Sequence, residues 1–345
     1  MFKMKAQTLI PIVLCSLMMA CTGVHEESDI TAIKGATIFD GNGDSFANGV
    51  IVTNAGVIDC VGEESNCSIP SGAKVIDASG KYVTPGLVDA HMHFFQTAFF
   101  DSRPDALDLN ETYPISEVTA YQRQNPQRYY NSYLCSGITA VYDVDDEFIQ
   151  LAKENGTYYN PTLVVGSGYT VARRAAADIE AFKILDPNGC VDDKTRTLLE
   201  TAAQFKDHPR LTENVKNRLR QFDPETDRVS KQQLRNLKRL YDEGVKIVVG
   251  TDAGNPGTLH GISIYEEMEA MQSAGIAPED LIVMATKNGA ESMRRGNDFG
   301  TLEKGKFANL IIMDSDPSED ISNMKTITHT MIKGKLMKVD EIVKE

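Results

Sequence analysis

The sequence is short of basic residues and of cysteines. Its 35 lysines and arginines stand against 49 aspartates and glutamates, which gives a formal net charge of −14 at pH 7. A protein that binds nucleic acid needs a basic face to replace phosphate counterions, so this balance argues against such a partner. Six cysteines in 345 residues are too few for a scaffold built on disulfides. With 41% hydrophobic residues, the chain is expected to fold around an ordinary core.

Several motifs of catalysis and cofactor binding are also missing. The sequence has no G-x-S-x-G nucleophile elbow, no Walker loop and no CxxC pair, and the Gly-Asn-Gly at 41–43 does not extend into a dinucleotide fingerprint. After residue 20, no segment is apolar for long enough to span a membrane. These absences disfavour nucleophilic-serine, phosphate-loop, thiol-redox and dinucleotide chemistry.

Residues 1–20 are typical of a signal peptide. Two lysines precede the apolar stretch 6–20, which is too short to cross a bilayer. Ala20 is followed directly by Cys21, as at a bacterial lipoprotein cleavage site; the alternative is an ordinary signal peptide with a chance cysteine. We therefore expect an exported, periplasmic chain whose only membrane attachment is a lipid anchor on Cys21 of the mature protein.

Export changes the interpretation of the remaining cysteines. Cys60 and Cys67 lie seven residues apart and flank a turn, so in an oxidising compartment they can close a small disulfide loop. The alternative is two unpaired thiols. Cys135 and Cys190 have no partner that the sequence makes evident.

The hydrophobic pattern predicts an α/β protein with β-structure at both ends. Residues 30–81 and 300–338 alternate in period two and are interrupted by turn signals, which indicates short antiparallel strands in one split β-domain. Between them, strands and helices alternate as in a parallel sheet. The expected strands are 82–95, 138–144, 158–166 and 245–253. The expected helices are 115–135, 146–155, 172–184, 193–206, 212–222, 228–243, 262–274 and 278–293.

A metal-binding group is expected where two of these strands end. His91 and His93 follow an apolar run, and residues i and i+2 of a strand point to the same side, so both imidazoles can reach one cation such as zinc. Asp252 ends another expected strand between glycines and offers a third ligand that also accepts a proton; alternatively it caps the next turn. His260, eight residues later, is either a substrate-binding residue or an ordinary loop histidine.

Five motifs extend this pattern over nearly the whole of residues 30–338. In chain order they are GATIFDGNG, VTPGLVDAHMH, GTDAGNPGTLHG, ATKNGAESM and FGTLEKGKFANLIIMDSDP. With them the chain resembles the metal-dependent amidohydrolase superfamily, in the branch that contains imidazolonepropionase-like and prolidase-like enzymes. One departure is Asn309, where the family usually has Asp.

The resemblance implies a fold and a domain division. The family fold is a TIM-like (β/α)8 barrel beside a small β-sandwich made from both termini. The barrel would occupy residues 82–297, and the sandwich residues 30–81 and 298–338.

The resemblance also implies a reaction and its residues. The family hydrolyses an amide-type bond with water activated by one or two divalent metals, which we expect to be zinc. His91 and His93 would bind a metal, Asp252 would bind it and carry the proton, and His260 would lie near the substrate. The expected substrate is a small amide, a dipeptide or an N-acyl amino acid.

The chain departs from the family in its middle. Asp252 follows His93 by only 159 positions, whereas seven βα steps of about 30 residues need about 210. No histidine lies between His93 and His208, and Lys153, the only lysine between His93 and Lys183, falls in an expected helix. We therefore expect an incomplete barrel that lacks strands three to six, one partly retained metal site, no complete second site, and impaired activity.

Several explanations remain open for this departure. The chain is a natural deletion that lost catalysis, an altered form of a longer enzyme joined at residues 144–145, or a weak three-ligand enzyme completed by a second copy in a homo-oligomer. A rival from another class is a non-catalytic periplasmic lipoprotein that acts as a metal or small-molecule binding module. A deaminase would need a further strand-borne histidine, and none is apparent.

Overall fold

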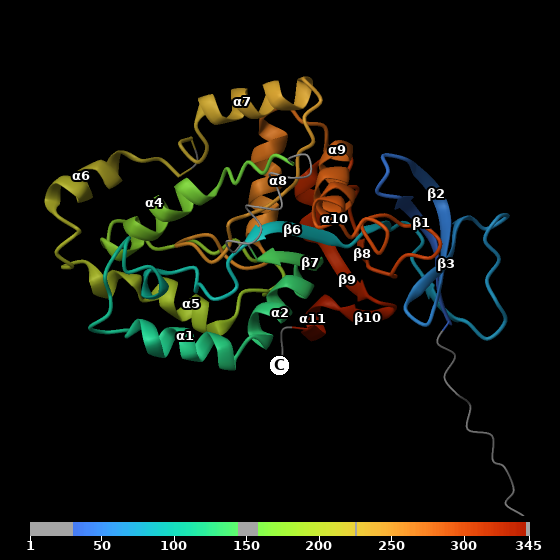
Figure 1. Ribbon diagram of the computed structural model, residues 1–345, viewed down its shortest axis with the longest axis horizontal. Coiled ribbons are helices and arrows are strands. Elements are labelled where there is room, and N and C mark those ends of the chain that lie inside the picture. The colour runs from blue at the N-terminus through green and yellow to red at the C-terminus, as the bar shows by residue number, and fades with distance from the viewer. Residues whose placement is uncertain (1–29, 144–157, 225, 343–345) are drawn as a thin grey trace, which may run out of the picture.

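The computed structural model of the protein describes residues 30–143, 158–224 and 226–342 (Figure 1). The predicted signal peptide 1–20, Cys21 and the expected helix 146–155 lie outside these residues. Among the residues that are described, no helix has both the length and the apolar character needed to cross a membrane.

Strands from both ends of the chain form one mixed eight-stranded sheet. Its order is β10-β9-β8-β5-β1-β2-β3, and β4 pairs in parallel with β1. The strands are β1 (Ile30–Phe39), β2 (Ser45–Asn54), β3 (Val57–Glu63), β4 (Lys74–Asp77), β5 (Tyr82–Pro85), β8 (Leu310–Met313), β9 (Ile327–Ile332) and β10 (Lys335–Lys338). The two ends meet where β5 runs antiparallel to β8. Ile33, Val83 and Ile312, from β1, β5 and β8, share one buried apolar cluster, so residues far apart in sequence bury each other.

A second sheet holds two parallel strands, β6 (Leu87–Met92) and β7 (Ile138–Asp143). The single strand expected over 82–95 is therefore wrong, because it is divided at Gly86 between the two sheets. A Cβ atom on Gly86 would lie 2.3 Å from the side chain of Thr139. Only glycine allows the chain to pass so close to β7 at this crossing.

Most of the helices lie between β6 and β8, and further short helices follow β8 and β10 (Figure 1). The expected helix 115–135 is two helices, because Pro126 stands at their junction and cannot donate to a continuing helix. The expected helix 172–184 lies earlier, at 165–176. The helical segments are η1 (Phe100–Ser102), α1 (Ile115–Gln124), α2 (Gln127–Cys135), α4 (Val165–Ala176), α5 (Asp193–Glu200), η2 (Ala202–Phe205), α6 (Glu213–Gln221), α7 (Lys231–Asp242), α8 (Ser263–Ser273), α9 (Pro278–Val283), the π-helical turn η3 (Met284–Asn288), α10 (Gly289–Ser292), η4 (Ile321–Thr326) and α11 (Val339–Ile342).

The strands expected over 158–166 and 245–253 are not formed as regular strands. Residues 165 and 166 already belong to α4, and Tyr159 and Ile247 make only a single parallel bridge. The segment up to residue 253 is nevertheless buried from Ile247 to Thr251 and lies along β6, with the amide of Ala90 bonded to the carbonyl of Val249 at 3.0 Å. Its glycines and the positive φ of 59° at Asp252 break the regular ladder.

Two disulfides cross-link the described chain. Cys60 pairs with Cys67, with their Cα atoms 5.7 Å apart. Cys135 at the end of α2 pairs with Cys190, which precedes α5, with their Cα atoms 5.5 Å apart. The second pair was not apparent in the sequence because its members are 55 residues apart and no local pattern links them.

Candidate metal centre

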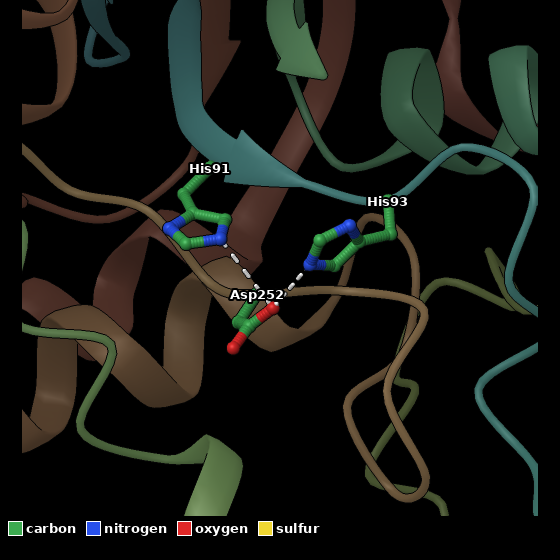
Figure 2. A group of neighbouring side chains, drawn as sticks. All are labelled: His91, His93 and Asp252. Atoms are coloured by element: carbon green, nitrogen blue, oxygen red, sulfur yellow. Dashed lines mark ion pairs between the residues drawn. The ribbon is translucent and has the colours of Figure 1, made fainter. Parts of the chain in front are cut away.

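His91, His93 and Asp252 come together at the end of β6 (Figure 2). Nε2 of His93 lies 2.8 Å from Oδ1 of Asp252, and Nε2 of His91 lies 3.5 Å from the same oxygen. One ligand atom from each residue falls within 4.8 Å of the others. The three side chains keep 28%, 27% and 19% of their surface exposed, so a substrate can reach the group.

A buried carboxylate fixes β6 against the segment that carries Asp252. Asp89 accepts hydrogen bonds from the amide and the hydroxyl of Thr251, at 3.0 and 2.6 Å, and from the amide of His91 at 3.2 Å. Burial raises the pKa of Asp89 to about 6, against the opposing effect of the bonds from Thr251. Sequence reasoning did not single out Asp89, although a charged residue inside an apolar run was a usable signal.

Glycines on both sides of Asp252 allow the two chain segments to approach. A Cβ atom on Gly250 would lie 2.8 Å from the backbone nitrogen of His91, and one on Gly254 would lie 2.6 Å from the carbonyl oxygen of His93. The amide of Asp252 bonds to the carbonyl of His91 at 2.8 Å. The close approach brings the carboxylate between the two imidazoles.

The protonation states of this group suit a divalent cation. Burial lowers the pKa of His91, which favours the neutral imidazole that a metal requires. Burial alone would raise the pKa of Asp252, but the hydrogen bond from His93 and the charges of His91, His93 and Arg103 outweigh it, and its pKa is lowered. Two imidazole nitrogens and a carboxylate form a ligand set typical of zinc and related metals.

Two sequence models of the Amidohydrolase family match the chain, one over residues 74–125 and the other over residues 187–337. The first contains both histidines of the site and the second contains its aspartate. The chain belongs to the amidohydrolase superfamily. Members of this superfamily use divalent metals, and His91, His93 and Asp252 form a group that could bind such a metal in this chain.

Individual relatives of the chain are remote. The imidazolonepropionase of Thermoanaerobacter pseudethanolicus is 31% identical over 107 residues, which are 29% of this chain and only 25% of that enzyme. The chain thus spans about a quarter of that relative's length. The imidazolonepropionase of Brevibacillus brevis is 23% identical, covering 85% of this chain and 91% of the relative.

Solved structures agree on the fold. The crystal structure of a Xaa-Pro dipeptidase with bound methionine in the active site has a TM-score of 0.57 and 19% identity, covering 90% of this chain and all of that one. At this identity the likeness concerns the fold alone.

His260 lies buried beside the site, where both of its ring nitrogens have protein partners. Nε2 lies 2.8 Å from the carbonyl oxygen of Gln96, so Nε2 carries the proton and donates it. Nδ1 therefore accepts from the hydroxyl of Tyr133, also at 2.8 Å. The ring stacks on Tyr129 at a centroid distance of 3.9 Å. These contacts hold the loop after Asp252 and leave no ring nitrogen free for a substrate.

The buried His260 is expected to make the stability of the protein sensitive to acid. Burial lowers its pKa from 6.5 to about 4. The unfolded chain takes up the proton first, so the free energy of unfolding falls as the pH drops from about 6.5 to 4, by about 3 kcal/mol. His260→Gln keeps a donor and an acceptor but does not titrate, and should lack this loss. Urea unfolding of both proteins at pH 7 and pH 4 measures the difference.

Wild type must be compared with His260→Gln because other buried groups change the stability in the opposite direction as the pH falls. Burial raises the pKa of Asp89 to about 6 and that of Glu267 to about 8, and each stabilises the fold as the pH falls. His208→Gln, at a half-buried surface histidine, is the matched control. An equal pH dependence in wild type and His260→Gln would contradict the prediction.

Within the described residues, no second group of three histidine, cysteine or acidic side chains lies close enough together to hold a metal. Lys153, weighed above as a middle-strand ligand, lies outside those residues.

Proposed function

We propose that this protein is a zinc-dependent hydrolase of the C–N bond of a non-standard amide, a dipeptide or an N-acyl amino acid. The observation that carries the proposal is the convergence of His91, His93 and Asp252 on one point at the end of β6. The resemblance to imidazolonepropionases and to prolidase-like structures supports hydrolysis of a carbon–nitrogen bond. The Xaa-Pro dipeptidase among the similar structures makes dipeptides a natural first test.

The three residues would have different roles in this hydrolysis. A bound divalent metal supplies polarisation of the substrate carbonyl and a lowered pKa for its water. His91 and His93 would hold that metal through Nε2. Oδ1 of Asp252 faces both rings, while its other carboxylate oxygen points away from them (Figure 2). That second oxygen can take a proton from the attacking water and pass it to the leaving nitrogen.

We further propose that the barrel is incomplete and the activity impaired. In the described residues, β6 pairs regularly with β7 alone, whereas the segment from residue 245 to 253 makes only isolated bridges. The alignment with the imidazolonepropionase of Brevibacillus brevis is 387 residues long and exceeds this 345-residue chain, so that relative carries residues opposite gaps here. Both observations support a TIM-like barrel over 82–297 that lacks strands three to six, beside a sandwich from 30–81 and 298–338.

The metal content and activity of the chain from residue 22 onward test this proposal. We expect about one bound zinc, and slow hydrolysis of at least one member of a panel of dipeptides and N-acyl amino acids. His91→Ala should lose both zinc and hydrolysis. Equal zinc in wild type and His91→Ala would show that the site is misplaced. Two tightly bound metals with fast turnover would contradict the incomplete barrel. An intact mass or a gene sequence that reveals extra residues between 144 and 145 would contradict it as well.

The alternative function is a degenerate amidohydrolase that binds a metal or a small molecule without turning it over. The part of the chain that the structure describes holds one such three-residue group, which favours this alternative because a family site with two metals needs more ligands. Zinc binding without hydrolysis of any substrate in the panel would select this alternative. Activity that rises with protein concentration would instead favour a homo-oligomer that completes the site.

We propose that the protein is exported and lipid-anchored through Cys21. The pairs Cys60–Cys67 and Cys135–Cys190 support an oxidising compartment. In cells supplied with labelled palmitate, wild type should carry the label and Cys21→Ala should not. Equal labelling of both would exclude the anchor.

A further inference from the structure

Asn255 lies between Asp252 and two hydrogen-bond donors from other parts of the chain. It is buried, with 4% of its surface exposed. Its Oδ1 accepts from the hydroxyl of Tyr169 at 2.7 Å and from the guanidinium of Arg103. Because a guanidinium can only donate, this atom must be the amide oxygen, and the NH₂ group of Asn255 must face Asp252.

That NH₂ group holds Asp252 at two points. Nδ2 of Asn255 donates to Oδ1 of the Asp252 side chain at 2.5 Å and to its backbone carbonyl at 3.1 Å. The first bond reaches the same oxygen that faces His91 and His93. The second stabilises the backbone of a non-glycine residue at a φ of 59°. One amide therefore fixes both the unusual backbone and the direction of the carboxylate.

The two donors are themselves held in place. Arg103 follows η1, and its guanidinium makes two bonds to Asp105, at 2.9 and 2.8 Å. Tyr169 lies on α4, and its ring lies 5.5 Å from the guanidinium carbon of Arg103 and 5.9 Å from that of Arg173. Asn255 thus connects the metal centre to two segments that contribute no ligand to it.

We propose that Asn255 is a positioning residue for the metal centre, and that Tyr169 and Arg103 act on Asp252 through it. The inference rests on the proposed function, since it requires that His91, His93 and Asp252 hold a metal. Asn255 keeps the ligand oxygen of Asp252 directed at the point between the two imidazoles. Without that bond, the carboxylate can rotate away, and part of the binding free energy is spent on ordering it again.

The test is a zinc titration in competition with a coloured chelator, on the full mature chain. Asn255→Ala should weaken zinc binding about 10- to 100-fold, as expected for a residue that orients a ligand. Tyr169→Phe removes one hydrogen bond and should weaken it about 2- to 10-fold. If Tyr169 acts through Asn255, the double variant should bind zinc no more weakly than Asn255→Ala alone. If Tyr169 supported the site independently of Asn255, the fold-changes in zinc affinity of the two substitutions would instead multiply.

Tyr158→Phe is the matched control, because the Tyr158 hydroxyl bonds to Glu291 and Lys246 and not to the site. If Asn255→Ala does not fold, Asn255→Gln, which moves the amide by one methylene, provides the second background. Zinc binding unchanged in the Asn255 variant overturns this inference alone, and equal effects of Tyr169→Phe in both backgrounds overturn the route through Asn255. A wild type that binds no zinc overturns the proposed function and this inference together.

Discussion

Asp252→Asn is expected to lower turnover at least about 1000-fold, within the range that general acid–base groups contribute. The substitution removes the proton acceptor and also the negative charge that balances a cation between His91 and His93. Zinc affinity should fall by at least about 100-fold, because a neutral amide oxygen replaces a directly ligating carboxylate. Steady-state kinetics on whichever substrate the panel yields measures the first effect, and chelator competition measures the second.

Asp252→Asn is expected to leave the fold intact, so a loss of zinc binding and turnover can be distinguished from a loss of folding. Asn keeps the shape of the side chain, so the circular dichroism spectrum and the thermal midpoint should stay close to those of wild type. Asp314→Asn is the matched control, since Asp314 is exposed just after β8 and pairs with Lys81. Full zinc affinity and full turnover in Asp252→Asn would exclude this residue as ligand and as proton carrier.

Replacing both Cys135 and Cys190 with alanine is expected to lower the free energy of unfolding by about 4 kcal/mol. The bond closes a loop between residues 55 apart, and the entropy it removes from the unfolded chain grows with the length of that loop. Both cysteines are buried, so a lost contact adds to the effect. Urea unfolding followed by far-UV circular dichroism measures the change.

The Cys60–Cys67 disulfide is the natural comparison for the Cys135 and Cys190 variant. Cys60 and Cys67 are only seven residues apart, so their joint replacement should lower the free energy of unfolding by about 2 kcal/mol. The long loop should therefore lose clearly more stability than the short one. Equal losses, or no loss in the Cys135 and Cys190 variant, would mean that the cross-link does not restrict the unfolded state as argued.

The parts of the fold that were predictable depend on local patterns. Period-two alternation predicted strands within 30–81 and near the C-terminus, and β1 to β4 and β8 to β10 lie there. The apolar run 245–253 has the composition of a strand, and it is buried from Ile247 to Thr251 and at Ala253. A regular ladder, however, depends on neighbouring strands that composition does not describe. The junction at Gly86 was missed for the same reason, since it depends on contact with Thr139.

The site residues likewise differ in whether a local sequence pattern indicates them. His91 and His93 were selected because two residues apart in a strand is a local relation, and Asp252 because it ends an apolar run between glycines. Asp89 and Asn255 are bonded to other segments of the chain, and no periodicity in the sequence indicates such bonds. Each nevertheless left a trace in the sequence, as a polar residue within two or three positions of a candidate ligand.

The pairing of β5 with β8 has a consequence for how the chain acquires its structure. Pro85 meets Leu310 across that pair, so the sheet cannot close until more than two hundred further residues have been synthesised. Contacts so distant in sequence slow folding, because a long loop must be ordered before they form. A nascent chain of this kind stays open for most of its synthesis. The export proposed for this chain would need such a delay if the polypeptide crosses the membrane before it folds.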